Sequence, residues 1–465
     1  MPAAKDWALV RYLGRNGDVR HLLRLMALAL VLGGVAAGCA SDPPGRTRVA
    51  HDSFEAYRHD TVRWLAARRA ALGLDASTEV ELNAPQEWRP AGGVRGGVLL
   101  VHGLGDSPWS FHDLGQELAR QGFLVRSVLL PGHGTHPSDM LDVTLQDWHA
   151  VVAEQAAVLQ RDAGDVYLGG FSTGANLVLD VAYDSPGVAG LLLFSPAFRS
   201  SVSVDWLAPL VAPVRPWLVD PDAAAEHVPV RYTMVPTNGF AQFYRSSRLA
   251  QRRLASETFD KPVLMVLAAA DSVVDTAYAV DTFRTRLPHP ASRLLWYGAR
   301  PEGSGRDARI LERPDALPEW RISQFSHMGV LFAPENPLYG RDGTVRLCRN
   351  GHDEQAARTC RQGGEVWFSE WGYREAGKVH ARLTFNPYFA WQAARMGEVL
   401  DAGMSRTRAE RGGGCVDRRG CSASRLRRAA CAGKALRMWK GCRPAQLRGR
   451  ALVGSTRAIR GTPRR

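Results

Sequence analysis

The segment Gly170-Phe171-Ser172-Thr173-Gly174 has the G-x-S-x-G spacing of a turn that presents a nucleophilic serine. The five residues alone are a weak signal, because a glycine-rich chain of this length can produce the pattern by chance. The context strengthens it: the short apolar run DVYLGG enters the motif, and a stretch with helical apolar spacing leaves it. Such a turn is strained and leaves space only for glycine two positions either side of the serine. Ser172 is therefore the candidate nucleophile.

A serine hydroxyl becomes an effective nucleophile when a histidine accepts its proton and a carboxylate orients that histidine. In sites of this type both partners follow the serine, each on a loop at the carboxyl end of a strand. Asp271 ends the apolar run PVLMVLAAAD, so we prefer it as the acid over Asp275, which stands at the start of the next helix. His327, in QFSHMG, follows the last expected strand and precedes the closing helix. We prefer it as the base over His352 and His380, which fall in a polar insert or a strand-like segment.

Backbone N–H groups must also stabilise the oxyanion that forms during acyl transfer. Thr173, directly after the nucleophile, should supply one of them. The glycine-rich turn HGLG follows the first core strand and should supply the other, and within it we choose Leu104. His133, in the PGHG turn after the second strand, precedes the serine in the chain and is expected to be structural or to lie at a pocket rim.

These residues need a scaffold, and from Val94 onward short apolar runs alternate with amphipathic stretches. The runs expected as strands are VRGGVLLVHG, FLVRSVLLPGHG, DVYLGG, GLLLFSP, KPVLMVLAAAD and SRLLWYG. Helices are expected over residues 53–72, 109–121, 145–161, 173–183, 277–286 and 386–400. This alternation predicts an α/β fold with a mostly parallel, doubly wound sheet covered by helices on both faces.

Two stretches interrupt the alternation. Residues 199–260 lie between two strands and are rich in aromatic residues and proline, so we expect a cap over the sheet. Its aromatic side chains either line a substrate pocket or form a small core of the cap itself. The aromatic residues singled out here are Trp206, Trp217, Tyr232, Phe240, Phe243 and Tyr244. Residues 338–382 hold Cys348 and Cys360, which form a disulfide in an oxidising compartment or else stay as free thiols.

The N-terminus has the features of an export signal. Residues 1–38 combine early Lys and Arg residues with an apolar run too short to span a bilayer, which is typical of a signal peptide. The run ends in VAAGC, which resembles the lipobox of bacterial lipoproteins. That resemblance implies that Cys39 is lipidated, becomes the mature N-terminus and anchors the protein to a membrane of the bacterial cell envelope, favouring the outer membrane. The alternative is an ordinary secreted protein. In either case, residues 39–93 are expected to form a linker and a helix.

The net charge of +13 is concentrated at the other end of the chain. Residues 401–465 hold 18 Lys and Arg against 3 Asp and Glu, which leaves −2 for the remainder. A nucleic-acid-binding protein carries its basic surface on the folded body, so no nucleic-acid partner is expected. The tail lacks apolar periodicity and is expected to be disordered. None of the seven cysteines has the C-x2-C spacing of a zinc site, so no structural zinc is expected.

Together the motifs resemble those of a known group. LLVHGLGDSP, LLPGHG, TLQDW, GFSTG, LAAADSVVD and SHMG are similar to motifs of the carboxylesterase and monoacylglycerol lipase branch of the α/β-hydrolases, which includes serine aminopeptidase-like members. The resemblance covers residues 94–400. It implies the α/β-hydrolase fold with an inserted cap that shapes an acyl pocket, hydrolysis of small acyl esters through an acyl-enzyme, and no metal or organic cofactor. The long inserts before and after His327 and the basic tail depart from the pattern.

Two other functions stay open on the sequence. A peptidase that releases N-terminal residues would use the same three residues, but it also needs a carboxylate in the cap to hold the substrate's amine. The candidates for that carboxylate are Asp220, Asp222 and Glu226. A non-catalytic envelope lipoprotein could use the fold for binding alone, but such a protein has no reason to maintain the strained serine turn. The oligomeric state and the natural substrate are not indicated by the sequence.

Overall fold

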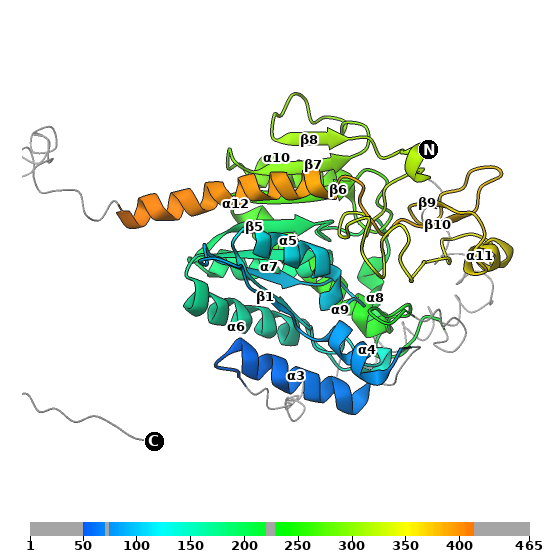
Figure 1. Ribbon diagram of the computed structural model, residues 1–465, viewed down its shortest axis with the longest axis horizontal. Coiled ribbons are helices and arrows are strands. Elements are labelled where there is room, and N and C mark those ends of the chain that lie inside the picture. The colour runs from blue at the N-terminus through cyan, green and yellow to red at the C-terminus, as the bar shows by residue number, and fades with distance from the viewer. Residues whose placement is uncertain (1–49, 70–73, 220–227, 413–465) are drawn as a thin grey trace, which may run out of the picture. The chain divides into compact units, whose positions relative to one another are not determined.

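A single eight-stranded sheet forms the centre of the molecule. The computed structural model describes residues 50–69, 74–219 and 228–412, and of residues 405–412 it describes the backbone alone. The strand order is β1-β3-β2-β4-β5-β6-β7-β8, and every neighbouring pair is parallel except β1 and β3 (Figure 1). The predicted α/β class with a mostly parallel sheet is therefore confirmed.

The bounds of the elements are as follows. The strands are β1 Glu87–Trp88, β2 Gly97–Val101, β3 Leu124–Val128, β4 Val166–Phe171, β5 Val188–Phe194, β6 Val263–Ala268, β7 Arg293–Tyr297 and β8 Ile310–Arg313, with β9 Trp367–Ser369 and β10 His380–Arg382 in a separate parallel pair. The α-helices are α3 Phe54–Arg68, α4 Ala76–Asn83, α5 His112–Arg120, α6 Leu145–Ala163, α7 Thr173–Asp184, α8 Ala208–Val211, α9 Thr237–Ser256, α10 Thr276–Arg286, α11 Glu354–Arg361 and α12 Phe389–Gly412.

The apolar runs form buried strands because both faces of the sheet are covered. Successive side chains of a strand point to opposite faces. In β2, Leu99 and Val101 join a core that includes residues of α6, α7, α9 and α10, whereas Val98 and Leu100 join a core that includes residues of α5 and α12. The two layers of helices therefore bury a continuous apolar sheet, as a doubly wound fold requires.

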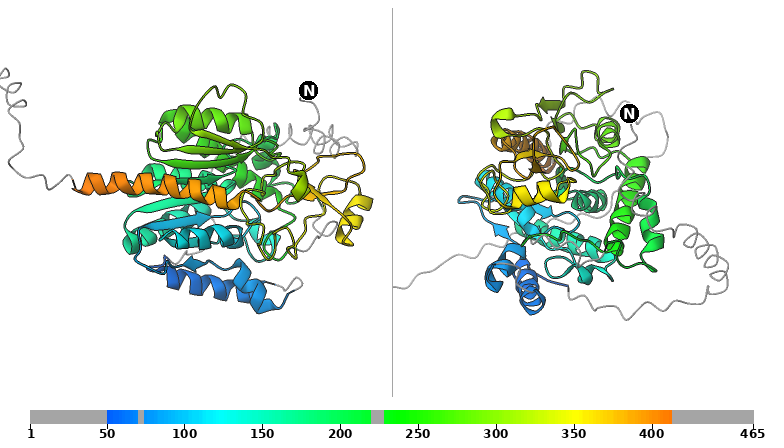
Figure 2. Two further views of the ribbon diagram at one scale, coloured as in Figure 1. Left: turned by 45° about the horizontal axis from the view of Figure 1, so that its top comes forward. Right: turned by 90° about the vertical axis from the view of Figure 1, so that its right-hand side faces the viewer.

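The carboxyl ends of the parallel strands face the segment between β8 and α12. In Figure 1 the arrowheads point toward the end of the sheet where α11, β9 and β10 lie, and Figure 2 shows the same grouping from two other sides. Residues 338–382, expected as an insert, contain these three elements and contribute Tyr339, Leu347 and Phe368 to the core on the α5 and α12 face. The insert is thus packed on the body.

The stretch expected as a cap contains α8 and α9. Helix α9 also packs along α7: the amide of Asn176 in α7 donates to the hydroxyls of Ser246 (3.1 Å) and Ser247 (3.4 Å). Ala250 and Leu254 of α9 are buried in the main core. The second half of α9 therefore covers the sheet as one of its flanking helices.

Several short elements were not anticipated from the sequence. Strand β8 has the sequence ILER, in which only the first residue is buried, because it lies at the edge of the sheet. Strand β1 has two residues at the opposite edge. Helix α11 and strand β9 lie in the polar insert, where the sequence has little apolar periodicity, whereas the strand-like segment at His380 does form β10. Weak patterning is expected for elements that bury only part of their surface.

Some expectations fall on residues outside the structure's described ranges. They concern the signal peptide, Cys39, the tail beyond residue 412, and the acidic residues Asp220, Asp222 and Glu226. Within the described ranges, no helix combines the length and the apolar character needed to cross a bilayer.

Candidate active site

Ser172 occupies a sharp turn between β4 and α7. Its backbone φ of +54° is a conformation that side-chain-bearing residues rarely adopt. A Cβ placed on Gly174 would lie 2.0 Å from the carbonyl oxygen of Val101, and one on Gly170 would lie 2.5 Å from the amide nitrogen of Ala175. Both glycines are therefore required by close backbone approach, and the turn points Ser172 out from the carboxyl end of the central strand.

Asp271 and His327 come from loops distant in sequence and meet directly. Asp271 follows β6, and its Oδ2 lies 2.6 Å from Nδ1 of His327. Its other oxygen, Oδ1, accepts hydrogen bonds from the amides of Val273 (2.8 Å) and Val274 (3.1 Å). Asp271 is 2% exposed and His327 7% exposed. The carboxylate is thus fixed on both oxygens in a site from which water is largely excluded, and a short charge-assisted bond of this kind orients the imidazole.

The His327 ring lies beside the serine turn. Its centroid is 4.9 Å from that of Phe171, the residue before Ser172, and Ser172 is itself 5% exposed. The backbone carbonyl of His327 accepts a 3.0 Å hydrogen bond from the hydroxyl of Ser195, which follows the neighbouring strand β5. The structure therefore brings the three sequence-predicted residues Ser172, Asp271 and His327 together at the carboxyl edge of β4, β5 and β6.

The weaker candidates for acid and base lie elsewhere. Asp275 caps α10 through a 3.0 Å bond from the amide of Tyr278 and pairs with Arg199 at 3.6 Å. His352 and His380 stack on each other in the insert, with ring centroids 5.7 Å apart. Their partners are therefore groups other than Asp271.

The loop after β2 leaves the amide of Leu104 available beside the serine turn. Its Gly105 amide donates to Nε2 of His133 (3.0 Å), and its Asp106 amide donates to the carbonyl of Gly103 (3.2 Å). Within the described part of the chain, the amides of Leu104 and Thr173 have no hydrogen-bond partner. Thr173 is the first residue of α7, where the helix dipole favours negative charge. These two unpaired donors have the properties that an oxyanion site needs.

Two buried histidines support this loop in their neutral form. Nε2 of His102 accepts the amide of Leu130 (3.0 Å), and its ring lies 4.8 Å from that of His133. Burial and the neighbouring His133 place the pKa of His102 well below its usual value. Burial also lowers the pKa of His133 to about 4. His133, expected to be structural or a rim residue, is fully buried and acts as the acceptor that fixes Gly105.

Two residues near the site were missed by sequence reasoning. Asp106 is buried in the loop after β2, and its Oδ1 lies 3.7 Å from Nε of Arg231. Burial raises the pKa of Asp106, against the opposing effects of the positive charges of Arg231 and His327. Glu370, in the insert, accepts the backbone amide of His327 (2.8 Å). Asp106 lies within the HGLGDS motif and could have been noticed there, whereas nothing in the local sequence distinguishes Glu370 from other acidic residues of the insert.

Cys348 and Cys360 are joined in a disulfide, with their Cα atoms 5.6 Å apart. Both are buried in the core beneath the insert. Of the two sequence interpretations, the bonded pair is the one the structure contains, and it closes the segment that ends shortly before Glu370.

The aromatic side chains within residues 199–260 lie in two different environments. Tyr232 and Phe243 are buried in the main core, whereas Trp206 is 50% and Phe240 40% exposed. The amide of Tyr232 donates to the carbonyl of Gly105 (2.6 Å), so this segment contacts the loop that carries Leu104. The aromatics therefore do not gather into a separate core of the cap.

A parallel sheet with a strained serine turn at the end of a central strand, and an Asp–His pair on the following loops, defines a serine hydrolase of the α/β-hydrolase fold. Residues 92–298 match the family model described as serine aminopeptidase, S33. The chain is 29% identical over 184 residues to a thermostable monoacylglycerol lipase of Bacillus sp. (strain H-257), a match covering 38% of this chain and 71% of that protein.

Solved structures give matches of similar extent. One, from work on the metagenome-derived lipolytic enzymes LipS and LipT, is 25% identical with a TM-score of 0.39, covering 46% of this chain and 86% of that one. The monoacylglycerol lipase of Paleococcus ferrophilus is 18% identical with a TM-score of 0.38, covering 46% and 87%. The chain has the α/β-hydrolase fold, and the family match and the lipase relative support the branch that contains esterases and monoacylglycerol lipases.

Proposed function

We propose that this enzyme hydrolyses carboxylic esters with Ser172 as nucleophile, His327 as general base and Asp271 as the orienting acid. The observation that carries the proposal is the 2.6 Å contact between Asp271 and His327 beside the strained turn of Ser172. Because Asp271 is hydrogen-bonded to Nδ1, Nε2 of His327 is the nitrogen available to accept the serine proton. The monoacylglycerol lipase relative supports an ester as the substrate.

The proposed reaction has two half-reactions. The oxygen of Ser172 attacks the ester carbonyl while its proton moves to His327, and the resulting oxyanion is bound by the amides of Leu104 and Thr173. The imidazolium, stabilised by Asp271, gives the proton to the departing alcohol and leaves an acyl-enzyme on Ser172. Water, deprotonated by His327, attacks the acyl group, and the free acid is released when the serine recovers its proton.

We test this proposal with a p-nitrophenyl ester series and the variant Ser172→Ala. The variant should retain the wild-type Tm but lose turnover by several orders of magnitude, with residual catalysis from the oxyanion donors and binding alone. A fluorophosphonate probe should label Ser172 in the wild type and leave the variant unlabelled. Turnover by Ser172→Ala close to that of the wild type would contradict the assignment of the nucleophile.

We further propose that the cap segment selects apolar acyl groups. The hydrogen bond from the amide of Tyr232 to the carbonyl of Gly105 places part of the cap segment against the loop that carries Leu104. Trp206 adds an exposed aromatic surface. Each methylene buried contributes about 0.8 kcal/mol, so kcat/KM should rise about fourfold per added CH2 until the pocket is full. Acetate to decanoate esters measure this in the wild type and in Trp206→Ala, Trp217→Ala and Phe243→Ala. A flat profile, or one that none of the three substitutions changes, would contradict acyl selection by the cap.

A peptidase activity is the alternative that the family model suggests. It needs an anionic group for the substrate's amine, and the buried carboxylate of Asp106 already lies within 3.7 Å of Arg231. That pairing favours the ester. Aminoacyl p-nitroanilides distinguish the two: hydrolysis of an anilide with a free amine, but not of its acetylated form, would assign a peptidase. Absence of both hydrolysis and fluorophosphonate labelling would instead indicate a non-catalytic envelope protein.

For location, we propose a lipid anchor on Cys39 that places the enzyme at the bacterial cell envelope. The support is the VAAGC sequence of residues 35–39, which ends the apolar run of the N-terminal segment. Firm anchoring requires more than one acyl chain, because a single chain binds a membrane only marginally. Wild-type protein should partition into detergent, and Cys39→Ala should be soluble or unprocessed. A soluble, unacylated wild-type protein by mass spectrometry would overturn the anchor and leave the catalytic assignment intact.

A further inference from the structure

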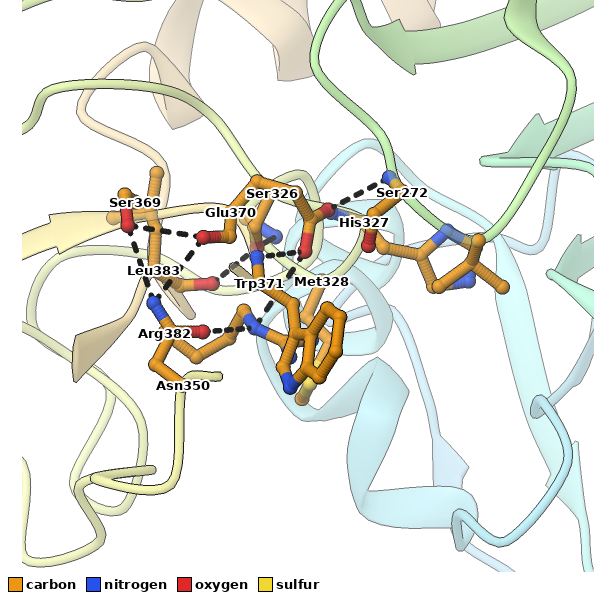
Figure 3. Close-up of polar contacts among 12 residues, drawn as sticks. Ser272, Ser326, His327, Met328, Asn350, Ser369, Glu370, Trp371, Arg382 and Leu383 are labelled. Atoms are coloured by element: carbon orange, nitrogen blue, oxygen red, sulfur yellow. Dashed lines mark hydrogen bonds and ion pairs between the residues drawn. The ribbon is translucent and has the colours of Figure 1, made fainter. Parts of the chain in front are cut away.

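Glu370 lies in the insert that follows His327 in the chain. It comes directly after β9 and is only 2% exposed, although its side chain carries a carboxylate. Burying a charged group is unfavourable unless it is paired and hydrogen-bonded. The contacts of Glu370 therefore show what compensates this burial (Figure 3).

One carboxylate oxygen of Glu370 joins the two loops that carry the acid and the base. Its Oε2 accepts the amide of His327 at 2.8 Å and the amide of Ser272 at 3.3 Å. Ser272 is the residue directly after Asp271. A single oxygen atom thus fixes the separation of the Asp271 loop and the His327 loop, and the two backbones meet at this point (Figure 3).

The other oxygen is held within the insert. Oε1 accepts the amide of Trp371 at 2.5 Å and lies 3.5 Å from Nε of Arg382. Nε of Arg382 also donates to Oδ1 of Asn350 (2.8 Å), whose amide donates to the hydroxyl of Ser369 (3.1 Å). The position of Glu370 is therefore set by several bonds, and its hold on the two loops is correspondingly rigid.

A neutral side chain of the same shape cannot make these contacts. The amides of His327 and Ser272 on one side, and of Trp371 on the other, are all donors, so both oxygens must accept. A glutamine offers one acceptor oxygen and one NH2 group, and the NH2 group would face a donor in either orientation.

We propose that Glu370 is a positioning residue of this hydrolase, which acts through His327 by fixing the acid loop and the base loop at their working separation. The inference rests on the proposed roles of Asp271 and His327. It makes the insert after His327 a part of the active-site support, because the insert provides a carboxylate that bonds the backbone amides of both loops.

The test compares Glu370→Gln with the matched control Glu375→Gln. Glu375 lies in the same insert but bonds the side chains of Ser323 and Lys378, and it accepts no backbone amide from either catalytic loop. We expect Glu370→Gln to lower kcat by about 10²-fold with KM within about twofold, since a misplacement of the base by about 1 Å has an effect of this size. Glu375→Gln should match the wild type in both kcat and KM.

The outcomes separate this inference from the proposed function. A fluorophosphonate labels an activated serine whatever the substrate, so its rate with Ser172 reports the Glu370 effect even if no ester is turned over. If Glu370→Gln does not fold, Glu370→Asp replaces it: both acceptor oxygens stay but the reach shortens, so kcat should fall less. Glu370→Gln with kcat and labelling rate within threefold of the wild type would overturn the inference, as would a wild type that the probe does not label.

Discussion

The substitution Asp271→Asn tests the site most sharply, because the structure determines how the new side chain must lie. Oδ1 of Asp271 accepts the amides of Val273 and Val274, at 2.8 Å and 3.1 Å. In the variant this position has to be taken by the amide oxygen, because an NH2 group there would face two donors. The NH2 group is then directed at Nδ1 of His327, 2.6 Å from the position of Oδ2.

The consequence is a change of tautomer. Nδ1 of His327 must now accept a hydrogen bond, so the ring proton moves to Nε2, which can no longer take the proton of Ser172. The negative charge that stabilises the imidazolium is lost as well. In a known serine triad the same exchange lowers kcat by ~10⁴-fold, equivalent to about 5.4 kcal/mol of barrier at 1.36 kcal/mol per factor of ten. We expect an effect of this order, with little change in Tm.

Turnover of p-nitrophenyl butyrate and thermal unfolding measure this prediction, with Asp275→Asn as the control. Asp275 caps α10 through Tyr278 and does not contact His327, and asparagine is an equally good N-cap, so its substitution should change stability by less than about 1 kcal/mol and leave kcat near the wild-type value. The reasoning is refuted if Asp271→Asn retains kcat within tenfold of the wild type, or if Asp275→Asn has the larger effect on turnover.

Three further predictions concern the surroundings of the site. Burial lowers the pKa of His133 from near 6.5 in the unfolded chain to about 4 in the folded protein. Its contribution to stability is therefore complete above pH 6.5 and is lost as the pH falls toward 4, by on the order of 3 kcal/mol. Unfolding titrations should show a smaller loss in His133→Gln, because glutamine can accept the Gly105 amide without titrating. Gly174→Ala places a Cβ 2.0 Å from a carbonyl oxygen of β2 and should destabilise by about 3 kcal/mol or more, so a variant with wild-type Tm would contradict the described turn. Replacing Cys348 and Cys360 by Ser should cost about 3 kcal/mol and lower kcat; unchanged kcat would mean that the insert supports the site without its disulfide.

The sequence predicts the central strands well because their signal is local. Runs such as GLLLF are apolar throughout, which occurs when both faces of a parallel sheet are buried, and in β5 all seven residues are buried. The edge strand β8 lacks such an apolar run. Only Ile310 of its four residues is buried, so its sequence resembles that of a loop.

For the site, the limit of prediction is set by contacts between distant loops. Ser172 is marked by the two glycines that its turn requires, and Asp271 by the strand that it ends. Glu370 has no such local signature: its function depends on where the insert places it relative to His327, and that position follows from the packing of residues far apart in the chain. A single sequence contains no short-range pattern that encodes this contact.

The last helix has a consequence for how the protein is made. Tyr167 in the central strand β4 is fully buried, and its hydroxyl donates to the carbonyl of Leu400 in α12 at 2.6 Å. A ribosome synthesises Tyr167 more than two hundred residues before Leu400, so this hydroxyl lacks its partner throughout most of translation, and an unsatisfied buried donor costs about 1–3 kcal/mol. The amide of Gln392 similarly donates to the carbonyl of Val330. The core around β4 is therefore complete only after α12 has been synthesised, more than two hundred residues after the strand itself.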